Sequence, residues 1–301
     1  MPEVIEVRQY KDFLKKKLKN KYINDINILK GRYKKHGPFN NYNRLKSNMP
    51  LKVLDVKTKG KFLYFVLDKG LYLFSTLGLR GGWTYYSYKQ NKFIFPNLLE
   101  YLGNYDISKY KQNALNHLNV EFKINDGIIY FFDTLQNGTF KLVINKEELN
   151  KKLKILGPDI MDIETNYAVF KNQIMKKNNL KKPIGLILIN QKVISGIGNY
   201  LRADILWMSK VSPFKLVCDL DDKELKKIYK NSRLLTWGEY NYNEALKQGI
   251  IKKSDKLPRD YKRNFFIYKQ KTDIYGNLVI KEELYEGSAK RFIYWVKDIQ
   301  K

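Results

Sequence analysis

The first residues of the chain, Met1-Pro2-Glu3, could place a nucleophile beside a proton carrier. Initiator methionine is normally removed before a small residue such as proline, which would leave the secondary amine of Pro2 at the head of the chain. An α-amine has a pKa of about 8 against about 10.4 for lysine, so far more of it is nucleophilic at neutral pH. It could form an iminium ion with an electrophilic carbon, and Glu3 could carry protons. The alternative is an ordinary start whose acids favour a helix dipole.

A second candidate is the run Gly196-Ile197-Gly198-Asn199-Tyr200, which precedes a predicted helix. Two glycines allow a tight turn whose N–H groups can point at one phosphate, aided by the positive N-terminus of the helix. Asn199 adds a neutral side-chain donor. The alternative is a pair of helix caps without a ligand.

Two turns in the first half of the chain form a third candidate. Thr58-Lys59-Gly60-Lys61 leads into one predicted strand, and the glycine-rich stretch 75–83 leaves the next. The alternatives are solvated lysines and an ordinary turn.

Hydrophobic spacing predicts the elements that position these residues. Apolar residues recur at three- and four-residue spacing from Val4 to Leu18, which predicts an N-terminal helix. β-Branched and aromatic runs predict strands at 53–56, 61–67, 71–77, 120–124, 128–133 and 139–144. The turns at 68–70, 125–127 and 136–138 would close hairpins. Two sets of hairpins indicate a β-sandwich.

The second half of the chain has a different pattern. Helical spacing covers 167–175, 186–189, 200–208 and 225–246, with Asp221-Asp222 as the N-terminal signal of the last helix. Strand-like runs follow at 265–268, 278–281 and 292–296. We therefore expect an α+β fold with a β-sandwich domain over 1–146, a charged linker over 147–156, a helical domain over 157–258 and a strand-containing part over 259–301.

Charge and cysteine content limit the partners and sites. The 301 residues include 57 Lys+Arg and 30 Asp+Glu, a net charge of +27 that favours a polyanion, nucleic acid rather than an anionic membrane. One Cys and two His exclude a disulfide framework and a four-ligand zinc site. No apolar run approaches the roughly 18–20 residues of a membrane span, and no signal peptide is evident. We expect a soluble, intracellular protein without a metal or cofactor.

These features, in this order, resemble the formamidopyrimidine-DNA glycosylase / endonuclease VIII family, and specifically its eukaryotic-type endonuclease VIII-like branch. The family begins Pro-Glu-x-x-Glu, has an Arg/Lys-Gly-Lys turn, then Leu-Gly-Met-x-Gly, then Leu-Gly-Pro-Asp. The matching segments are 2–6, 59–61, 77–81 and 156–159. The most specific match is Gln191 followed by Gly-Ile-Gly-Asn-Tyr-Leu-Arg-Ala-Asp-Ile-Leu at 196–206.

The resemblance implies a monomeric, bifunctional DNA glycosylase/AP lyase that acts on damaged DNA wherever DNA is repaired. Such enzymes flip the damaged base out, cleave its glycosidic bond and nick the strand by β- and δ-elimination. By resemblance, Pro2 attacks the sugar C1′, Glu3 transfers protons, and Lys61 contacts DNA at the flipped nucleotide. Glu6 and Leu79 would also bind DNA, while Asn199 and the finger arginine Arg291 would hold phosphate.

The chain departs from the family in two places. The usual four-Cys zinc finger is absent, and residues 265–301 resemble the zincless β-hairpin finger of some members. The family fills the hole left by the flipped base with Met, Arg and Phe, where this chain has Leu79, Leu135 and Asn137. We therefore expect weak reading of the opposite base and activity on single-stranded or bubble DNA. A short lesion loop near 249–260 favours oxidised pyrimidines and hydantoins over 8-oxoguanine.

Two other functions stay open at the level of sequence. A non-catalytic DNA-binding protein could use the same scaffold. A basic RNA-binding or ribosome-associated protein is less favoured, because aromatic stacking motifs and basic tails are not evident.

Overall fold

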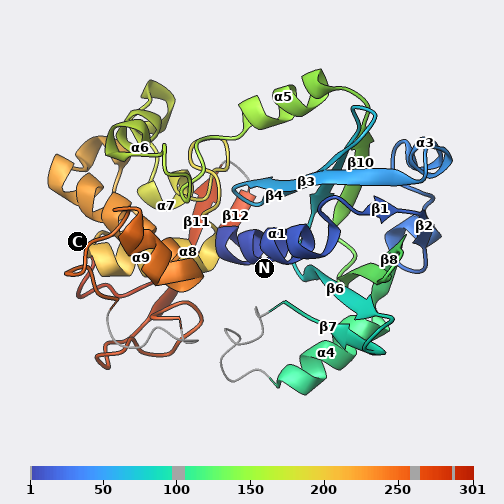
Figure 1. Ribbon diagram of the computed structural model, residues 1–301. Coiled ribbons are helices and arrows are strands. Elements are labelled where there is room, and N and C mark those ends of the chain that lie inside the picture. The colour runs from blue at the N-terminus through green and yellow to red at the C-terminus, as the bar shows by residue number, and fades with distance from the viewer. Residues whose placement is uncertain (1, 97–105, 258–264, 287–288) are drawn as a thin grey trace. The chain divides into compact units, whose positions relative to one another are not determined.

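The computed structural model describes residues 2–96, 106–257, 265–286 and 289–301 (Figure 1). The chain divides into two compact units, one of Pro2 with residues 6–154 and one of residues 3–5 with 155–301. The first unit is mainly sheet and the second mainly helix, which confirms the expected α+β class.

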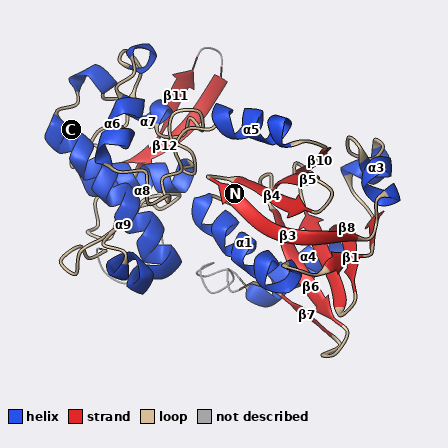
Figure 2. Cartoon of the chain, turned by 45° about the horizontal axis from the view of Figure 1, so that its top comes forward, coloured by secondary structure: helices blue, strands red, loops and turns tan. Residues whose placement is uncertain are grey.

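Two five-stranded antiparallel sheets form the first unit (Figure 2, strands in red). The first sheet has the order β1 (Tyr22–Ile23), β3 (Leu51–Lys59), β4 (Phe62–Leu67), β5 (Tyr72–Thr76), β10 (Thr139–Val143). The second has the order β2 (Asp25–Ile28), β8 (Leu118–Ile124), β9 (Gly127–Asp133), β6 (Gly81–Ser87), β7 (Lys92–Ile94).

The core of the first unit lies between these sheets and is centred on Trp83. Its indole ring is fully buried, with ring centroids 5.4 Å from Phe65 and 5.7 Å from Phe140 of the first sheet. Phe131 of the second sheet lies 5.2 Å away. Edge-to-face pairs of this kind stabilise a core beyond simple area burial. The expected β-sandwich is confirmed.

Helix α1 (Val4–Leu18) adds the apolar face predicted from its spacing, because Val7, Tyr10, Leu14 and Leu18 are buried in this same core. Three further helices of the unit are α2 (Arg32–Lys35), α3 (Tyr42–Ser47) and α4 (Ile107–Asn116). The segment expected to be a linker, 147–156, instead lies almost entirely within helix α5 (Lys146–Ile155). Acidic residues in its first turn and lysines in its last complement the helix dipole.

The turns of the sandwich differ in one respect from the expectation. The turns at 68–70 and 125–127 close hairpins, β4–β5 and β8–β9. The turn at 136–138 does not, because β9 belongs to the second sheet and β10 to the first. It carries the chain from one layer to the other, a distinction that local sequence does not contain.

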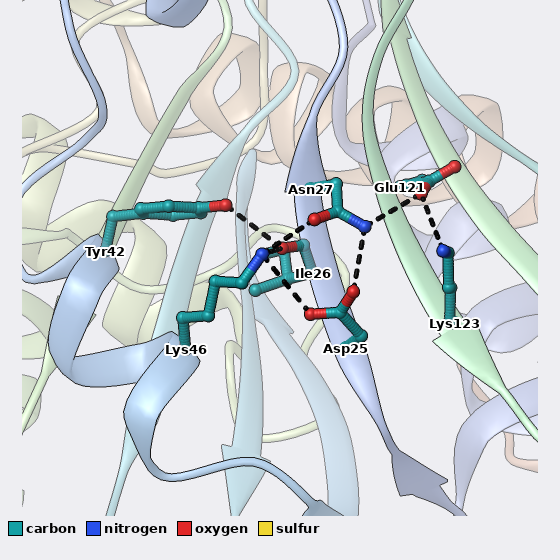
Figure 3. A network of polar contacts seen from close by, with 7 residues as sticks. All are labelled: Asp25, Ile26, Asn27, Tyr42, Lys46, Glu121 and Lys123. Carbon is teal, nitrogen blue, oxygen red and sulfur yellow. Dashed lines mark hydrogen bonds and ion pairs between the residues drawn. The ribbon is translucent and has the colours of Figure 1, made fainter.

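A polar network covers the edge strand β2 (Figure 3). Lys46 Nζ of α3 donates to Asn27 Oδ1 at 2.7 Å, and Asn27 Nδ2 donates to Glu121 Oε1 of β8 at 2.9 Å. Tyr42 Oη donates to the main-chain carbonyl of Ile26 at 3.0 Å. Helix α3 therefore occupies an edge carbonyl that would otherwise be open to pairing with another strand.

The second unit is built from helices and one hairpin. Its helices are α6 (Tyr167–Ile174), α7 (Ile184–Ile187), α8 (Asn199–Ser209) and α9 (Asp222–Lys247), with 3-10 turns η2 (Lys177–Asn179) and η3 (Val217–Asp219). A capping box starts α9, since Asp221 accepts from the Glu224 N–H while the Glu224 carboxylate accepts from the Asp221 N–H. The hairpin pairs β11 (Ile280–Glu286) with β12 (Ala289–Trp295).

The strand expected at 265–268 is wrong, because this segment is irregular. Its N–H groups bond to a side chain instead of to a neighbouring strand. The carboxylate of Asp204, fully buried on α8, accepts from Phe266, Ile267 and Tyr268 at 3.1–3.4 Å. A buried carboxylate can satisfy several N–H donors, so a strand partner is unnecessary here.

A second carboxylate organises the turn that follows. Asp273 accepts from the N–H groups of Tyr275 and Asn277, both at 2.9 Å, and from Trp207 Nε1 of α8 at 3.1 Å.

The zinc ion usual in such fingers does not fit this chain, whose one cysteine, Cys218, lies in η3. Among the described residues, no three His, Cys, Asp or Glu side chains are grouped to hold a metal. None of the described helices is both long and apolar enough to cross a membrane.

We predict that Asp204→Ala destabilises the second unit by about 3 kcal/mol, because three buried N–H groups lose a charged acceptor. The free energy of unfolding in urea measures this. Asp298→Ala, at an exposed aspartate, is the matched control. Equal stability of the two variants would contradict the role given to Asp204.

We also predict that acid weakens the finger through Asp273. Burial alone would raise the pKa of Asp273, but hydrogen bonds from Asn277, Tyr275 and Trp207 hold it below its ordinary value. Because the folded pKa is the lower one, this carboxylate stabilises the fold above about pH 4, and the contribution is lost as the pH falls through the folded pKa. Unfolding in urea at pH 7 and near pH 3 should show a smaller acid effect in Asp273→Asn than in the unchanged chain. An equal acid effect in both proteins would rule this out.

Candidate active site

The carboxylate of Glu3 is the centre of the candidate site in the second unit. It is 1% exposed, and it accepts from the N–H groups of Gly198 at 2.6 Å, Tyr200 at 3.1 Å and Leu201 at 3.4 Å. These N–H groups belong to the first turn of α8, where the helix itself offers them no partner. The positive end of the helix dipole also favours the negative carboxylate. Glu3 is therefore fixed in place immediately after Pro2 in the chain.

The turn before α8 is shaped to receive the N-terminal segment. Gly196 has a φ of +114°, and a Cβ there would lie 2.9 Å from the Cβ of Val4. The Gly196 carbonyl accepts from the Val4 N–H at 3.1 Å, while the Gly196 N–H donates to Gln191 Oε1 at 2.9 Å. Glycine is needed because of both the backbone conformation and the close approach.

This arrangement corrects one expectation from the sequence. The N–H groups of the turn and of the α8 N-terminus were expected to point at a phosphate. Those of Gly198, Tyr200 and Leu201 instead bind the chain's own Glu3. The anion at this helix end is internal, so a phosphate near α8 must be bound by side chains.

Asn199 and Arg291 are the side chains of this unit that were expected to hold phosphate. Asn199 is half-buried at the start of α8, and its Oδ1 atom accepts from Arg202 Nη2 at 3.3 Å. Arg291 is exposed on β12, opposite Leu284 of β11. The main-chain carbonyl of the next residue, Phe292, accepts from the same Arg202 nitrogen at 2.6 Å. Arg202 therefore donates hydrogen bonds both to the Asn199 side chain and to the β12 backbone next to Arg291.

Lys61 lies in the first unit, in the turn formed by residues 60 and 61 between β3 and β4. Gly60 in this turn has a φ of +55°. The ammonium of Lys59 donates to the carbonyl of Leu153, in the last turn of α5, at 2.9 Å. A cation at a helix C-terminus is favoured by the dipole, so this contact ties the turn to α5.

Leu79 and Leu135 lie on two turns that touch in the first unit. Their side chains are 46% and 45% exposed. A Cβ at Gly78 would lie 2.6 Å from the Gly138 nitrogen, so the two backbones are in close contact. The buried Asp133 carboxylate accepts from the N–H groups of Leu135 at 3.1 Å and Gly138 at 2.6 Å. Asp133 therefore fixes the backbone at Leu135, and the turn that carries Leu79 packs closely against the same segment.

Glu6 follows on α1 and is half-buried. It acts on the buried Tyr10, whose pKa is raised well above its ordinary value, first by burial, then by Tyr110, and further by Glu6. Tyr10 is therefore a neutral phenol across the physiological range.

The structure groups the predicted residues by unit. Glu3, Asn199 and Arg291 belong to the second unit, and Pro2, Glu6, Lys61 and Leu79 to the first. Their catalytic and DNA-binding roles stay predictions. The sequence analysis assigned no role to Arg202, Asp204 and Asp133, which form hydrogen bonds with Asn199, with the segment 266–268 and with the backbone of Leu135. A signal was present in α8, where Arg202 and Asp204 interrupt an apolar run.

Known proteins match the chain along most of its length. Family models match in three parts: the formamidopyrimidine-DNA glycosylase N-terminal domain over residues 1–140, its H2TH domain over 156–236 and its C-terminal domain over 254–301. The chain is 32% identical over 234 residues to the formamidopyrimidine-DNA glycosylase of Mycoplasma genitalium, covering 77% of this chain and 72% of the relative. The Mycoplasma pneumoniae protein of the same name is 31% identical over 238 residues, covering 77% and 75%.

Solved structures give the same answer for the fold. The Lactococcus lactis formamidopyrimidine-DNA glycosylase, non-covalently bound to DNA containing an AP site, aligns with a TM-score of 0.73 and 17% identity over 100% of both chains. A complex of that protein with DNA containing an oxidised pyrimidine aligns with a TM-score of 0.71 and 19% identity, again over 100% of both chains.

The relatives named above are bacterial, so they lend no support to the eukaryotic-type branch expected from the sequence. The family itself is confirmed by the three matching models and by the Mycoplasma relatives. The chain belongs to the formamidopyrimidine-DNA glycosylase / endonuclease VIII family, and it is a DNA glycosylase with AP lyase activity that serves base excision repair.

Proposed function

We propose that this enzyme removes oxidised bases from DNA through a Schiff base on Pro2 and then nicks the strand by β- and δ-elimination. The observation that supports the proposal is the position of Glu3. Three main-chain N–H groups fix its carboxylate, and Glu3 directly follows Pro2 in the sequence. Removal of Met1 leaves Pro2 with a secondary amine, whose iminium ion has no N–H left to lose and therefore stays positively charged.

The proposed reaction begins with attack at C1′ and ends with two eliminations. The lone pair of the Pro2 nitrogen forms a bond to C1′ as the glycosidic bond breaks, and the base leaves with that bonding pair and the proton that the nitrogen gives up. The sugar ring opens when the C1′–O4′ bond breaks: O4′ keeps the bonding pair and takes a proton through Glu3, and the freed nitrogen lone pair completes the iminium ion. Loss of a C2′ proton then expels the 3′ phosphate, and a second elimination expels the 5′ phosphate. Glu3 carries protons in the first steps because it is the fixed carboxylate nearest in sequence to the nucleophile.

DNA is held mainly through its phosphates in this proposal. Lys61, Asn199 and Arg291 supply the specific contacts, Glu6 and Leu79 contribute to DNA binding, and the excess charge of +27 supplies long-range attraction. The Lactococcus lactis relative that shares the fold was solved bound to AP-site DNA, which supports DNA as the partner. Binding should weaken steeply as salt rises, because each neutralised phosphate releases counterions.

Oxidised pyrimidines and hydantoins are the proposed lesions. One basis is the segment 249–260, whose described part, 249–257, is a compact turn in which Asp255 accepts from the Lys252 N–H at 2.8 Å. Residues 258–260 lie outside the described residues. The Lactococcus lactis complex with oxidised-pyrimidine DNA adds support for this class. Single-stranded and bubble DNA are included because Leu135 and Asn137 take the places of larger side chains.

We predict that blocking the Pro2 nitrogen abolishes covalent chemistry but leaves DNA binding. Insertion of Lys between Met1 and Pro2 retains the methionine and turns the nitrogen into an amide. Borohydride trapping on abasic-site DNA should fall by at least about a thousandfold, since the nucleophile is lost. Pro2→Ala removes the secondary amine and should also lose trapping.

Binding to DNA with a tetrahydrofuran abasic analogue is the control, because this sugar cannot form an iminium ion. Its affinity should stay within about threefold in both variants. Undiminished trapping by the blocked chain would move the nucleophile to a lysine such as Lys61.

We predict that Leu79 and Leu135 act mainly on duplex substrates. An exposed leucine can enter the space left by a flipped base only where a stacked duplex exists. The double variant Leu79→Ala/Leu135→Ala should lose about tenfold in cleavage of an oxidised pyrimidine in duplex DNA, with less than about twofold change on single strands. Leu54→Ala, at an exposed leucine of β3, is the matched control. Equal losses on both substrates would show that the two leucines do not fill a duplex gap.

A further inference from the structure

Arg202 is a fully buried arginine that bonds to three separate segments of the second unit. Its exposure is 0%, and its Nη1 atom donates to the carbonyl of Gly185 in α7 at 3.1 Å. Its Nη2 atom donates to Asn199 Oδ1 at 3.3 Å and to the carbonyl of Phe292 in β12 at 2.6 Å. Burying a guanidinium is costly unless such acceptors surround it. The contacts therefore indicate a specific task for this residue.

The first consequence concerns the amide of Asn199. Arginine has only donors, so the atom of Asn199 that faces it must be the carbonyl oxygen. The Nδ2 atom of the Asn199 amide then points away from Arg202, and so do its two N–H groups. Phosphate oxygens accept hydrogen bonds and cannot donate them, so this is the orientation that phosphate binding requires. Without Arg202, the amide could turn over and present its oxygen instead.

The second consequence concerns Arg291. The carbonyl of Phe292 belongs to the residue directly after Arg291, so the bond to Arg202 fixes the backbone that carries the finger arginine. Arg202 and Arg291 also interact electrostatically. The pKa of Arg202 is lowered to about 10, mainly by burial; Glu3 opposes this shift and the charge of Arg291 adds to it, and Arg202 remains charged at neutral pH. A phosphate bound beside two cations relieves their mutual repulsion.

We propose that Arg202 is a positioning residue for DNA: one buried guanidinium sets the donor orientation of Asn199 and the position of Arg291 so that both grip the phosphates next to the lesion. This inference rests on the proposed function, because it assumes that Asn199 and Arg291 bind phosphate.

A double-mutant cycle between Arg202 and Asn199 tests the proposal. Arg202→Lys keeps the charge but cannot reach acceptors on both sides, and Asn199→Ala removes the amide. Binding of duplex DNA with a tetrahydrofuran abasic analogue should weaken about tenfold in each single variant, the loss expected for a charge-assisted hydrogen bond. The double variant should weaken by much less than a hundredfold, because both changes remove the Asn199 contact and only the part of the Arg202 effect that acts through Arg291 adds to it. A loss near a hundredfold would mean independent effects and would overturn the proposal.

Arg233 provides a matched control within the same unit. It is a buried arginine of α9 that donates to the carbonyls of Ile160 at 2.7 Å and Asp162 at 2.5 Å. Arg233→Lys should lower the melting temperature about as much as Arg202→Lys. Its effect on DNA binding should multiply with that of Asn199→Ala. The same non-additivity in this pair would assign the Arg202 effect to general destabilisation and reject the positioning role.

A second pair of variants applies even if Arg202→Lys does not fold. Asn199→Asp places a carboxylate opposite Arg202, while Asn199→Ala places nothing there. The Asp variant should melt at the higher temperature, since it gains an ion pair, yet bind DNA no better, since it lacks the donor NH2 group. An Asp variant that melts no higher than the Ala variant would show that residue 199 does not contact Arg202.

The unchanged enzyme separates this inference from the proposed function. Failure of the unchanged chain to bind the abasic analogue, or to be trapped on abasic-site DNA, would reject the proposed function itself. Normal binding and trapping with additive Arg202 and Asn199 effects would reject the positioning role alone.

Discussion

The second unit depends on one electrostatic contact, the bond between the carboxylate of Glu3 and the N-terminus of α8. Three main-chain donors surround a side chain that is 1% exposed. The contact joins residues nearly two hundred positions apart in sequence, so it fixes the beginning of the chain against the helix that carries Asn199. The Pro2 nucleophile that we propose would need this kind of anchoring, since chain termini are often poorly ordered unless they are tied down. The conformation of Gly196 and the bonds of Gln191 are consequences of the same requirement.

Helix α8 extends this organisation from the site to the finger. Arg202 reaches the β12 backbone, Asp204 receives the N–H groups of 266–268, and Trp207 bonds to Asp273. In a finger with zinc, four thiolates would gather these segments around one ion. Here hydrogen-bonded carboxylates and aromatic contacts serve that purpose, such as the tilted pair of Trp207 and Phe266, whose ring centroids are 4.9 Å apart. The finger is therefore tied to the helix at several points along its length instead of at one centre.

Sequence reasoning predicted the parts of this fold that are encoded locally. Hydrophobic spacing found α1 and the strands β3, β4, β5, β8, β9 and β10 of the sandwich, but it missed β1, β2, β6 and β7. Asp221 marked the start of α9. It failed where a partner distant in sequence decides the outcome. Residues 265–268 have strand-like composition, but the Asp204 carboxylate satisfies their N–H groups. The turn at 136–138 has a hairpin sequence, yet its strands pair in different sheets. The charged segment 147–156 looked like a linker because it is rich in charged residues, yet it forms helix α5, with Leu149 buried and a bond from Lys59 to its last turn.

The same limit explains the error at the Gly196–Gly198 turn. A glycine pair before a helix correctly indicates an anion site, but the identity of the anion is a long-range property. Glu3 already occupies the N–H groups of Gly198, Tyr200 and Leu201, so they cannot also bind a DNA phosphate. In our proposal, phosphate recognition near α8 comes from side chains, and Asn199 is an uncharged donor whose amide could turn either way. Buried Arg202 donates to the Asn199 oxygen and would thereby fix the orientation of this amide. The N-terminus of α8 thus binds the Glu3 carboxylate, while Arg202 would prepare Asn199 to bind DNA.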